Sequence, residues 1–466
     1  MNFKEYWAKA DDWINPIVVK EMRQSFNGRG LLASCGLLLI VNLLVFAVVA
    51  ANVNMSSINE GVGREFIGWS LLILTFGAMF GAAYPAASRF AEERRAEAMD
   101  LIYITTLTAP RLINGKFLSV LVLNFLMFSL CLPSLVLSYY LRGVAMEDVL
   151  FFIGISFCIS LVLTQFLLLC GTLGSWVLRG ALVICGIIVF STYVGVISTM
   201  HYHARGMLEF FTTCSIFCIL CFIVCYVLTL VSLLPPSANR MLPVRSTFLV
   251  VDAALLPVLL GLLPADGWDI WLVLSVALAS LTMVMAVMER LKQSKRVLQK
   301  LPNSALLRCV YFLVSSGSAG GVCYALLLGG GSFGLYFGLH GLDPRFHAAN
   351  LMGFFMYIGA YTAAALLLLR LVERRWRSFS GAHAWVVVAV FAIVVSVLST
   401  VVTGDSMVAR CVTPIGFMES DSEVALAAAG GWLLVFLVLN LPDFWRQFRE
   451  YFEPVEPEEA SYDAHS

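Results

Sequence analysis

The sequence predicts an all-α membrane protein, a polytopic helical bundle of about twelve transmembrane helices with both termini in the cytoplasm. Three observations predict it. The 466 residues are 60% hydrophobic and 13% charged, whereas typical globular domains have about 45–50% and about 25%. The apolar residues fall into runs of about 20, the length that crosses a hydrocarbon core of about 30 Å. Lys and Arg gather in alternate connecting segments, as they do in cytoplasmic loops.

The chain begins with a charged segment, 1–30, which predicts an amphipathic helix at the membrane surface. Asn15 is suited to cap this helix and Pro16 to occupy its first position. At 100° per residue, the apolar stripe comprises Val18, Val19, Met22 and Phe26. The side chains away from this stripe include Lys20, Arg23 and Gln24. Such a helix is expected to lie in the headgroup plane, with its apolar side toward the lipid.

Twelve candidate spans follow in chain order. In the first half they lie at 31–51, 66–87, 117–141, 150–174, 181–199 and 209–234. In the second half they lie at 247–263, 269–288, 305–328, 350–370, 384–403 and 424–441. With the N-terminus inside, about 25 of the 30 basic residues fall on the inner side, which supports this topology. The basic residues left outside are Arg64, Arg142, Arg205, Arg345 and Arg410.

The last segment, 443–466, predicts an interfacial helix and an acidic disordered tail. Asp443 could cap the helix, and one helical face would be aromatic. That face comprises Phe444, Trp445, Phe448, Tyr451 and Phe452. A juxtamembrane helix that only anchors the last span explains the pattern equally well. The tail reads EPVEPEEASYDAHS, which is acidic and contains proline, as disordered segments often do.

The residue types that build metal and cofactor sites do not converge, so neither a metal nor a cofactor is expected. His201 and His203 share a short outer segment, which an exposed loop pair explains better than a metal site. The span at 209–234 carries four cysteines on one face, namely Cys214, Cys218, Cys221 and Cys225. They extend over more than two turns and cannot converge on one zinc ion, so a packing stripe is expected.

Charged groups inside the spans are scarce. Only Asp252 qualifies, and it is expected near the inner boundary, snorkelling or paired with Arg245 as a structural acid. Secondary transporters often place carboxylates near the bilayer midplane, so this scarcity counts against that class. The sequence G-x-x-x-x-G-K-[ST] does not occur, so the chain itself is not expected to hydrolyse ATP. The formal net charge is zero, and no nucleic-acid partner is expected.

The segment between the second and third spans carries the most informative motif. It reads SRFAEERRAEAMDLIYITTLTAPRLINGKFL. It resembles a loop of type-2 ABC exporter permeases, in which a sequence similar to E-R-E-x-G-T-L-[DE]-L-L-L-x-T-P-L-S is followed by G-K. The matching residues are Glu93, Arg94, Asp100, Leu101, Thr105, Leu107, Gly115 and Lys116. The sequence departs from the family pattern at Arg95, Glu97, Ala98 and Thr106.

The N-terminal amphipathic segment resembles a second feature of the same family. A subgroup of these permeases begins with N-P-x-x-x-K-E-x-R-Q. The residues that match it are Asn15, Pro16, Lys20, Glu21, Arg23 and Gln24. The resemblance covers roughly residues 1–235, and the second half of the chain has no counterpart in the usual six-span permease.

The resemblance implies a domain organisation and a partner. Residues 31–240 would form a six-span permease half, and 241–442 a second six-span half. The segment 88–116 would be the coupling element, lying on a separate P-loop ATPase subunit and transmitting nucleotide-driven closure to the spans. The charges that would face this partner are Glu92, Glu93, Arg94, Arg95 and Asp100. Without such a partner, the segment would be a solvated charged loop.

The function that follows from the resemblance is ATP-driven export of an unknown substrate across a bacterial-type inner (plasma) membrane. The chain would not be an enzyme, because the partner would hydrolyse the ATP. A dimer of permease chains is typical of the family, although twelve spans could also supply both halves in one chain. Two alternatives stay open: a membrane scaffold that keeps the permease fold without transport, and a secondary transporter. A membrane enzyme is the weakest alternative, for want of a catalytic cluster.

Overall fold

The structure is a computed structural model of the whole chain, and every element it describes is helical. The described residues are 15–51, 62–95, 108–140, 145–173, 180, 186, 207–235, 238–264, 266–289, 304–340, 348–373, 381, 383–391, 394 and 423–452. Within these ranges there are thirteen α-helices and two short π-helical segments, and no strand. The predicted all-α class is confirmed.

Ten of the described helices are long and apolar enough to cross a membrane. They lie at Arg29–Val49, Glu65–Arg94, Ala109–Tyr140, Met146–Thr172, Thr212–Ser232, Met241–Leu262, Gly267–Met288, Ser318–Leu339, Ala348–Val372 and Leu426–Glu450. Each overlaps a predicted span. Of the two other predicted spans, 181–199 is described only at residue 186, and 384–403 only at 384–391 and 394. The total of twelve and the cytoplasmic location of the termini stay predictions.

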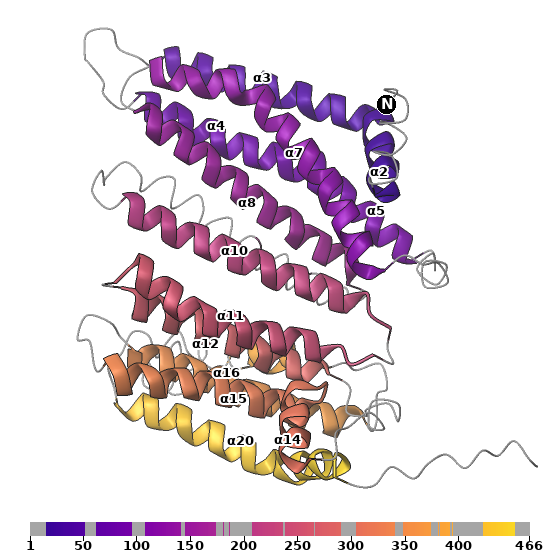
Figure 1. Cartoon of the computed structure of the whole chain (residues 1–466), viewed down its shortest axis with the longest axis vertical. Coiled ribbons are helices and arrows are strands. Elements are labelled where there is room, and N and C mark those ends of the chain that lie inside the picture. Colours follow the sequence, from indigo (N-terminus) through magenta and orange to yellow (C-terminus); the bar gives the residue numbers. More distant parts are fainter. Residues whose placement is uncertain are drawn as a thin grey trace, which may run out of the picture. The chain divides into compact units, whose positions relative to one another are not determined.

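The chain divides into two compact units, Met1–Leu234 and Pro235–Ser466. The helices of the first unit are α2 (Pro16–Asn27), α3 (Arg29–Ala51), α4 (Val62–Ala78), η1 (Met79–Ala83), α5 (Tyr84–Arg95), α7 (Ala109–Tyr140), α8 (Met146–Thr172) and α10 (Met207–Ser232). The π-helical η1 joins α4 to α5, so the three form one continuous span. The short α2 lies across the ends of its neighbours rather than along them (Figure 1).

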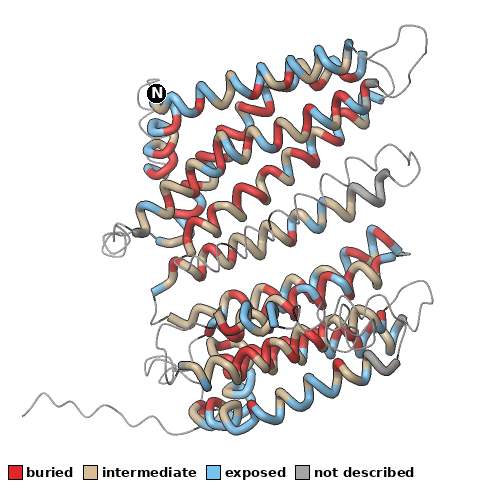
Figure 2. Tube along the Cα trace, turned by 180° about the vertical axis from the view of Figure 1, so that it is seen from behind, coloured by how far each residue is buried: buried red, intermediate tan, exposed pale blue. Residues whose placement is uncertain are grey.

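The helices of the first unit bury one side and leave the other exposed. Leu74, Ile113 and Met127 are fully buried in the core that α4, α7 and α8 share. The outer side of α3 exposes large apolar side chains along its length (Figure 2), including Leu32, Leu37, Ile40, Leu43, Leu44 and Val48. In water such a continuous apolar surface would favour aggregation, whereas lipid chains cover it at no cost. The exposure pattern therefore suits a helix that faces the bilayer.

The second unit is built around one central helix. Its helices are α11 (Met241–Leu262), α12 (Gly267–Met288), α14 (Ala305–Val314), α15 (Ser318–Leu335), η2 (Tyr336–His340), α16 (Ala348–Glu373) and α20 (Glu423–Glu450). The central helix is α12, which packs against α11, α15 and α16. Its side chains Trp271, Leu272, Ala279 and Met283 are almost fully buried. The polar side chains buried on α12, namely Ser275, Ser280 and Thr282, therefore lie among protein groups.

The predicted span at 305–328 is wrong in its position. The apolar run is broken after α14, which ends at Val314, and the crossing helix begins at Ser318 and extends to Leu339. Backbone carbonyl groups at the break are bound by a buried arginine, described below. An apolar run alone cannot reveal such a break, because the residues on both sides of it remain hydrophobic.

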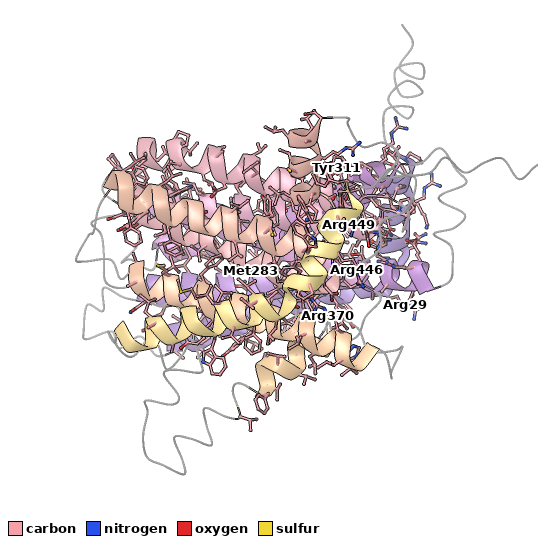
Figure 3. All side chains as sticks on the ribbon, turned by 90° about the horizontal axis from the view of Figure 1, so that it is seen from below. Arg29, Met283, Tyr311, Arg370, Arg446 and Arg449 are labelled. Carbon is pink, nitrogen blue, oxygen red and sulfur yellow. The ribbon has the colours of Figure 1, made fainter. Side chains whose placement is uncertain are left out.

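The predicted separate helix after Asp443 is also wrong. Instead, α20 continues through Pro442 and Asp443 to Glu450, and it bends as it approaches the labelled Arg446 (Figure 3). Proline is a common cause of such bends. Asp443 does not cap a helix but forms an ion pair with Arg370 of α16. Most of the aromatic face predicted to enter the headgroups packs against protein, where Phe444, Phe448, Tyr451 and Phe452 join a cluster with Phe312. The remaining residue of that face, Trp445, is 65% exposed.

Candidate functional site

The site begins with α2, whose first turn follows from its sequence. The Asn15 side-chain oxygen accepts a hydrogen bond from the Ile17 backbone N–H at 3.1 Å. Pro16 occupies the first position, where the helix needs no N–H donor. The predicted cap and helix start are therefore confirmed. The buried residues of α2 are Ile17, Val18, Glu21 and Ser25. Of the apolar stripe that was predicted to face the lipid, Phe26 is 48% exposed, whereas Val18 is buried against the protein.

Gly115 of α7 allows α2 to approach closely. A Cβ atom at this position would lie 2.9 Å from Ile17 Cβ and 2.9 Å from Asn15 Nδ2. Both distances are shorter than ordinary van der Waals contact, so a larger residue would push α2 away. The Asn15 amide also donates a hydrogen bond to the Arg111 carbonyl oxygen at 2.6 Å. Asn15 therefore both caps α2 and connects it to α7.

The next residue, Lys116, is the centre of an ion network that we call the ionic junction. Its members are Lys20, Glu21, Arg89, Glu93 and Lys116. Lys116 Nζ lies 2.5 Å from Glu21 Oε1 and 2.8 Å from Glu93 Oε2. Glu93 Oε1 accepts a hydrogen bond from Lys20 Nζ at 2.9 Å. Arg89 Nη2 lies 3.4 Å from Glu21 Oε2. The ionic junction thus joins α2, α5 and α7.

The two central charges of the ionic junction are almost completely buried. The side chains of Lys116 and Glu21 are each 1% exposed. The Lys116 ammonium group also lies 4.9 Å from the centre of the Phe90 ring, within the range of a cation–π interaction. Buried charges are costly to desolvate, so a pair of this kind is destabilising when either partner is removed. The hydrogen bond from Lys20 to Glu93 raises the pKa of Lys20, which keeps its ammonium group charged.

The structure corrects the expectation that all charges of the loop motif face a partner. Glu93 and Lys116 point inward because α2 presents opposite charges to both of them. Arg94 donates a hydrogen bond to the Ser232 carbonyl oxygen of α10 at 3.4 Å. Glu92 is exposed. Of the three acidic and basic side chains described between 92 and 94, only Glu92 therefore lies on the surface.

Several predicted site residues stand apart from the ionic junction. Arg23 and Gln24 are exposed on the outer side of α2. The predicted residues Asp100, Leu101, Thr105 and Leu107 lie outside the described residues, as does the side chain of Arg95. The structure thus brings together Lys20, Glu21, Glu93 and Lys116 from the two motifs, and adds Arg89. A signal for Arg89 was present in the sequence, because it stands one helical turn before Glu93.

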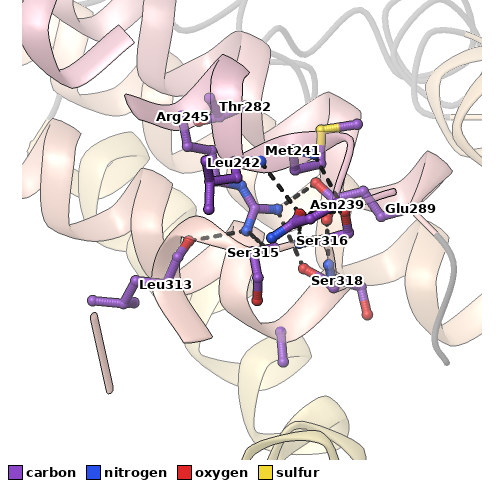
Figure 4. A network of polar contacts seen from close by, with 12 residues as sticks. Asn239, Met241, Leu242, Arg245, Thr282, Glu289, Leu313, Ser315, Ser316 and Ser318 are labelled. Atoms are coloured by element: carbon purple, nitrogen blue, oxygen red, sulfur yellow. Dashed lines mark hydrogen bonds and ion pairs between the residues drawn. The ribbon is translucent and has the colours of Figure 1, made fainter. Parts of the chain in front are cut away.

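A second buried ion pair, in the second unit, was not predicted from the sequence. Arg245 of α11 is 1% exposed and pairs with Glu289, at the end of α12, rather than with an acid on its own helix. Its guanidinium group also donates to the carbonyl oxygens of Leu313 at 2.9 Å, of Ser315, and of Gly317 at 3.3 Å. Glu289 Oε2 accepts a hydrogen bond from the Gly317 N–H at 2.5 Å. Figure 4 shows the arginine surrounded by these groups, which hold the break between α14 and α15.

Metal-ligating side chains do not converge in the described part of the chain, where no group of three or more His, Cys, Asp or Glu residues could hold a metal ion. The four cysteines of the predicted stripe lie on α10 as partly buried free thiols. Cys214 packs against the core of the first unit.

Comparison of the chain with protein-family models, curated proteins and solved structures finds no match. The sequence and the structure together establish a multi-pass helical membrane protein, and its described residues include ten candidate spans and a buried ion pair in each unit.

Proposed function

We propose that the chain is the permease subunit of an ATP-driven exporter of the ABC type and works with a separate P-loop ATPase. The proposal starts from the resemblance of two short segments, one in α2 and one running from α5 into α7. One observation carries it further, namely that the ionic junction joins the two segments. Lys20 and Glu21 come from the first segment, and Glu93 and Lys116 from the second. Residues that match two independent motifs therefore meet in one cluster.

The geometry supports a coupling role for this cluster. The ATPase would contact the end of α5, where Glu92 is exposed beside the inward-facing Glu93. Because α5 continues α4 and because α7 is itself a span, a displacement of α5 would act on two spans. The ionic junction would pass the same displacement to α2. Movements of this kind, in which packed helices shift as rigid bodies, are a common way to transmit a binding event.

The test is purification of the full chain from its native membrane in mild detergent. A soluble P-loop ATPase should copurify with it. The substitution Glu92→Lys should weaken ATPase binding about threefold, or ~0.7 kcal/mol, because an exposed charge at the edge of an interface has a modest effect. The thermal unfolding of the variant should be unchanged, since Glu92 is exposed.

Reversal of Lys292 and Lys300, in another segment that is predicted on the same side of the membrane, is the matched control for altered charge. This double variant should retain the ATPase. Recovery of the chain alone, together with a normal phenotype in cells that lack every candidate ATPase, would contradict the permease proposal and favour the scaffold. An equal loss of ATPase from both variants would mean that overall charge, and not the end of α5, governs the association.

A further inference from the structure

The second unit holds a carboxyl group near the middle of a membrane span. Asp252 lies about 16 Å from the start of α11 and about 15 Å from its end, at 1.5 Å per residue over Met241–Leu262. Its residue is 7% exposed. From the sequence, Asp252 was expected near the inner boundary, either snorkelling or paired with Arg245. The pairing is wrong, because Arg245 pairs with Glu289. Because α11 begins at Met241, earlier than predicted, Asp252 stands near the middle of this helix, and its position relative to the inner boundary stays a prediction.

The Asp252 carboxyl group lacks a counter-charge. None of the ion pairs of the described residues includes it, and its Oδ1 atom is buried without a hydrogen-bond partner among them. The neighbouring groups are neutral. The Trp271 indole and the Ser275 hydroxyl lie next to the carboxyl group, and the indole donates a hydrogen bond to the Asp252 backbone oxygen at 3.2 Å. The Ser275 hydroxyl lies 2.5 Å from that of Ser332, so a line of polar groups connects α11, α12 and α15.

The charged groups nearby are already engaged with one another. The charged and titratable side chains on α11 and on the elements around it include Arg245, Asp269, Glu289, Arg308, Tyr311, Tyr324 and Tyr336. Arg245 pairs with Glu289, and Asp269 accepts a hydrogen bond from Tyr336 at 2.6 Å. Tyr324 interacts electrostatically with Asp252, but its hydroxyl donates to the Arg245 carbonyl oxygen at 2.7 Å. An ionised Asp252 would therefore be an isolated buried charge, which is costly in an apolar interior.

We propose that Asp252 is an exchangeable proton-binding site in the second unit. In the packing described here the carboxyl group is protonated, and the proton resides on the otherwise unpartnered Oδ1. It leaves when movement of α11, α12 and α15 admits water: the O–H bond breaks, its electron pair stays on the carboxylate, and a water molecule accepts the proton. A metal cation fits less well. Divalent cations take about six oxygen ligands, whereas the cluster offers one free carboxylate oxygen and two hydroxyls that bond to each other.

The proposal is tested on the full chain in lipid nanodiscs, independently of any ATPase. A hydrophobic carbodiimide modifies protonated carboxyl groups in apolar surroundings, and mass spectrometry locates the adduct. At a pH of about 7.5, well above the usual carboxyl pKa of about 4, Asp252 should be modified at least about tenfold more than the boundary residue Asp269. Modification should fall as the pH is raised further. Asp252→Glu should keep a modified site at this position, whereas Asp269→Asn should leave the modification of Asp252 unchanged.

A second measurement tests whether the proton of Asp252 leaves and returns, and not only whether the carboxyl group is buried. Amide hydrogen–deuterium exchange gives the protection factors of α11 and α12 once the intrinsic, base-catalysed exchange rate at each pH is divided out. These protection factors should fall as the pH is raised in the natural chain and should be independent of pH in Asp252→Asn, which mimics the protonated form. Modification of Asp252 no greater than that of Asp269 would overturn the proposal. Protection by sodium or potassium ions at constant pH would also overturn it, in favour of a cation site. If Asp252→Asn does not accumulate in the membrane, the pH dependence of Asp252 modification in the natural chain still tests the proposal.

Discussion

Some residues in the first unit contribute to stability in a way that their chemical type alone does not indicate. Lys116 is a lysine at the start of a span, where such residues usually reach toward water, yet its ammonium group is buried against Glu21 and Glu93. Replacement of Lys116 by Met would remove the closest ion-pair partner of the buried Glu21 and leave Arg89 at 3.4 Å, with Lys20 acting on it electrostatically. We expect the free energy of unfolding to fall by about 3 kcal/mol, measured by denaturant unfolding in detergent micelles.

The double variant Lys116→Met, Glu21→Gln is the control for this prediction. It removes both charges and leaves no isolated carboxylate, so it should be more stable than Lys116→Met alone. The two single substitutions should therefore be strongly non-additive, as expected for side chains in direct contact. Additive losses would show that the pairing of Lys116 with Glu21 is not what stabilises the junction.

Gly115 supports a second prediction at the same scale. A methyl group at this position would collide with Ile17 and Asn15, so Gly115→Ala should displace α2 and reduce stability by about 1–3 kcal/mol. The matched control is Gly154 of α8, where an added Cβ meets nothing within 4 Å. Gly154→Ala should leave stability unchanged or raise it by up to about 1 kcal/mol, because alanine favours the helix. Equal effects of the two substitutions in thermal unfolding would contradict the close contact of α2 with α7.

At the scale of elements, the last part of α20 depends on α16. Arg370 of α16 pairs with Asp443 and donates a hydrogen bond to Asn440 Oδ1 at 2.5 Å, while Asn440 Nδ2 donates to the Ala363 carbonyl oxygen at 2.8 Å. Arg370→Met should therefore loosen the helix beyond Pro442. We expect the local opening free energy of residues 443–450 to fall on the order of 2 kcal/mol, which faster amide exchange over these residues would show.

Arg446 provides the control for α20. It lies 3.7 Å from the same Asp443, but its side chain is 65% exposed. Arg446→Met should change the opening free energy of residues 443–450, measured by amide exchange, by no more than about 0.5 kcal/mol. If both arginine variants accelerate exchange equally, the contact with α16 does not hold the end of α20.

The elements show which features can be predicted from the sequence and which cannot. The start of α2 was predicted correctly because Asn15 and Pro16 act on their own turn. The helix start at Asp443 was wrong because this residue is bound by Arg370, which is distant in the sequence. Length and hydropathy predicted the spans, but they could not locate the break at 315–317, which Arg245 stabilises from another helix. Likewise, the motifs named Glu21 and Lys116, but only the folded chain shows that they pair.

At the scale of the whole molecule, the membrane topology can be tested without reference to function. A cysteine introduced at Ser406 should react with a membrane-impermeant maleimide in intact cells, whereas one at Lys295 should not react until the cells are opened. The segment 289–304 is rich in Lys and Arg and is therefore predicted inside. The chain without an added cysteine gives the background from its native thiols. Reaction of Lys295→Cys in intact cells would contradict the twelve-span topology.

The buried arginine of the second unit has a consequence for how the protein is made. The carbonyl groups that Arg245 binds belong to residues 68, 70 and 72 positions later in the chain. At about 5–20 residues per second, a ribosome needs about 4–14 s to synthesise that stretch. During this interval α11 exists without the acceptors that its arginine needs inside the protein, so Arg245 must remain in contact with water or headgroups. The first helix of the second unit to be synthesised therefore cannot reach its final position before the chain has been made as far as Gly317.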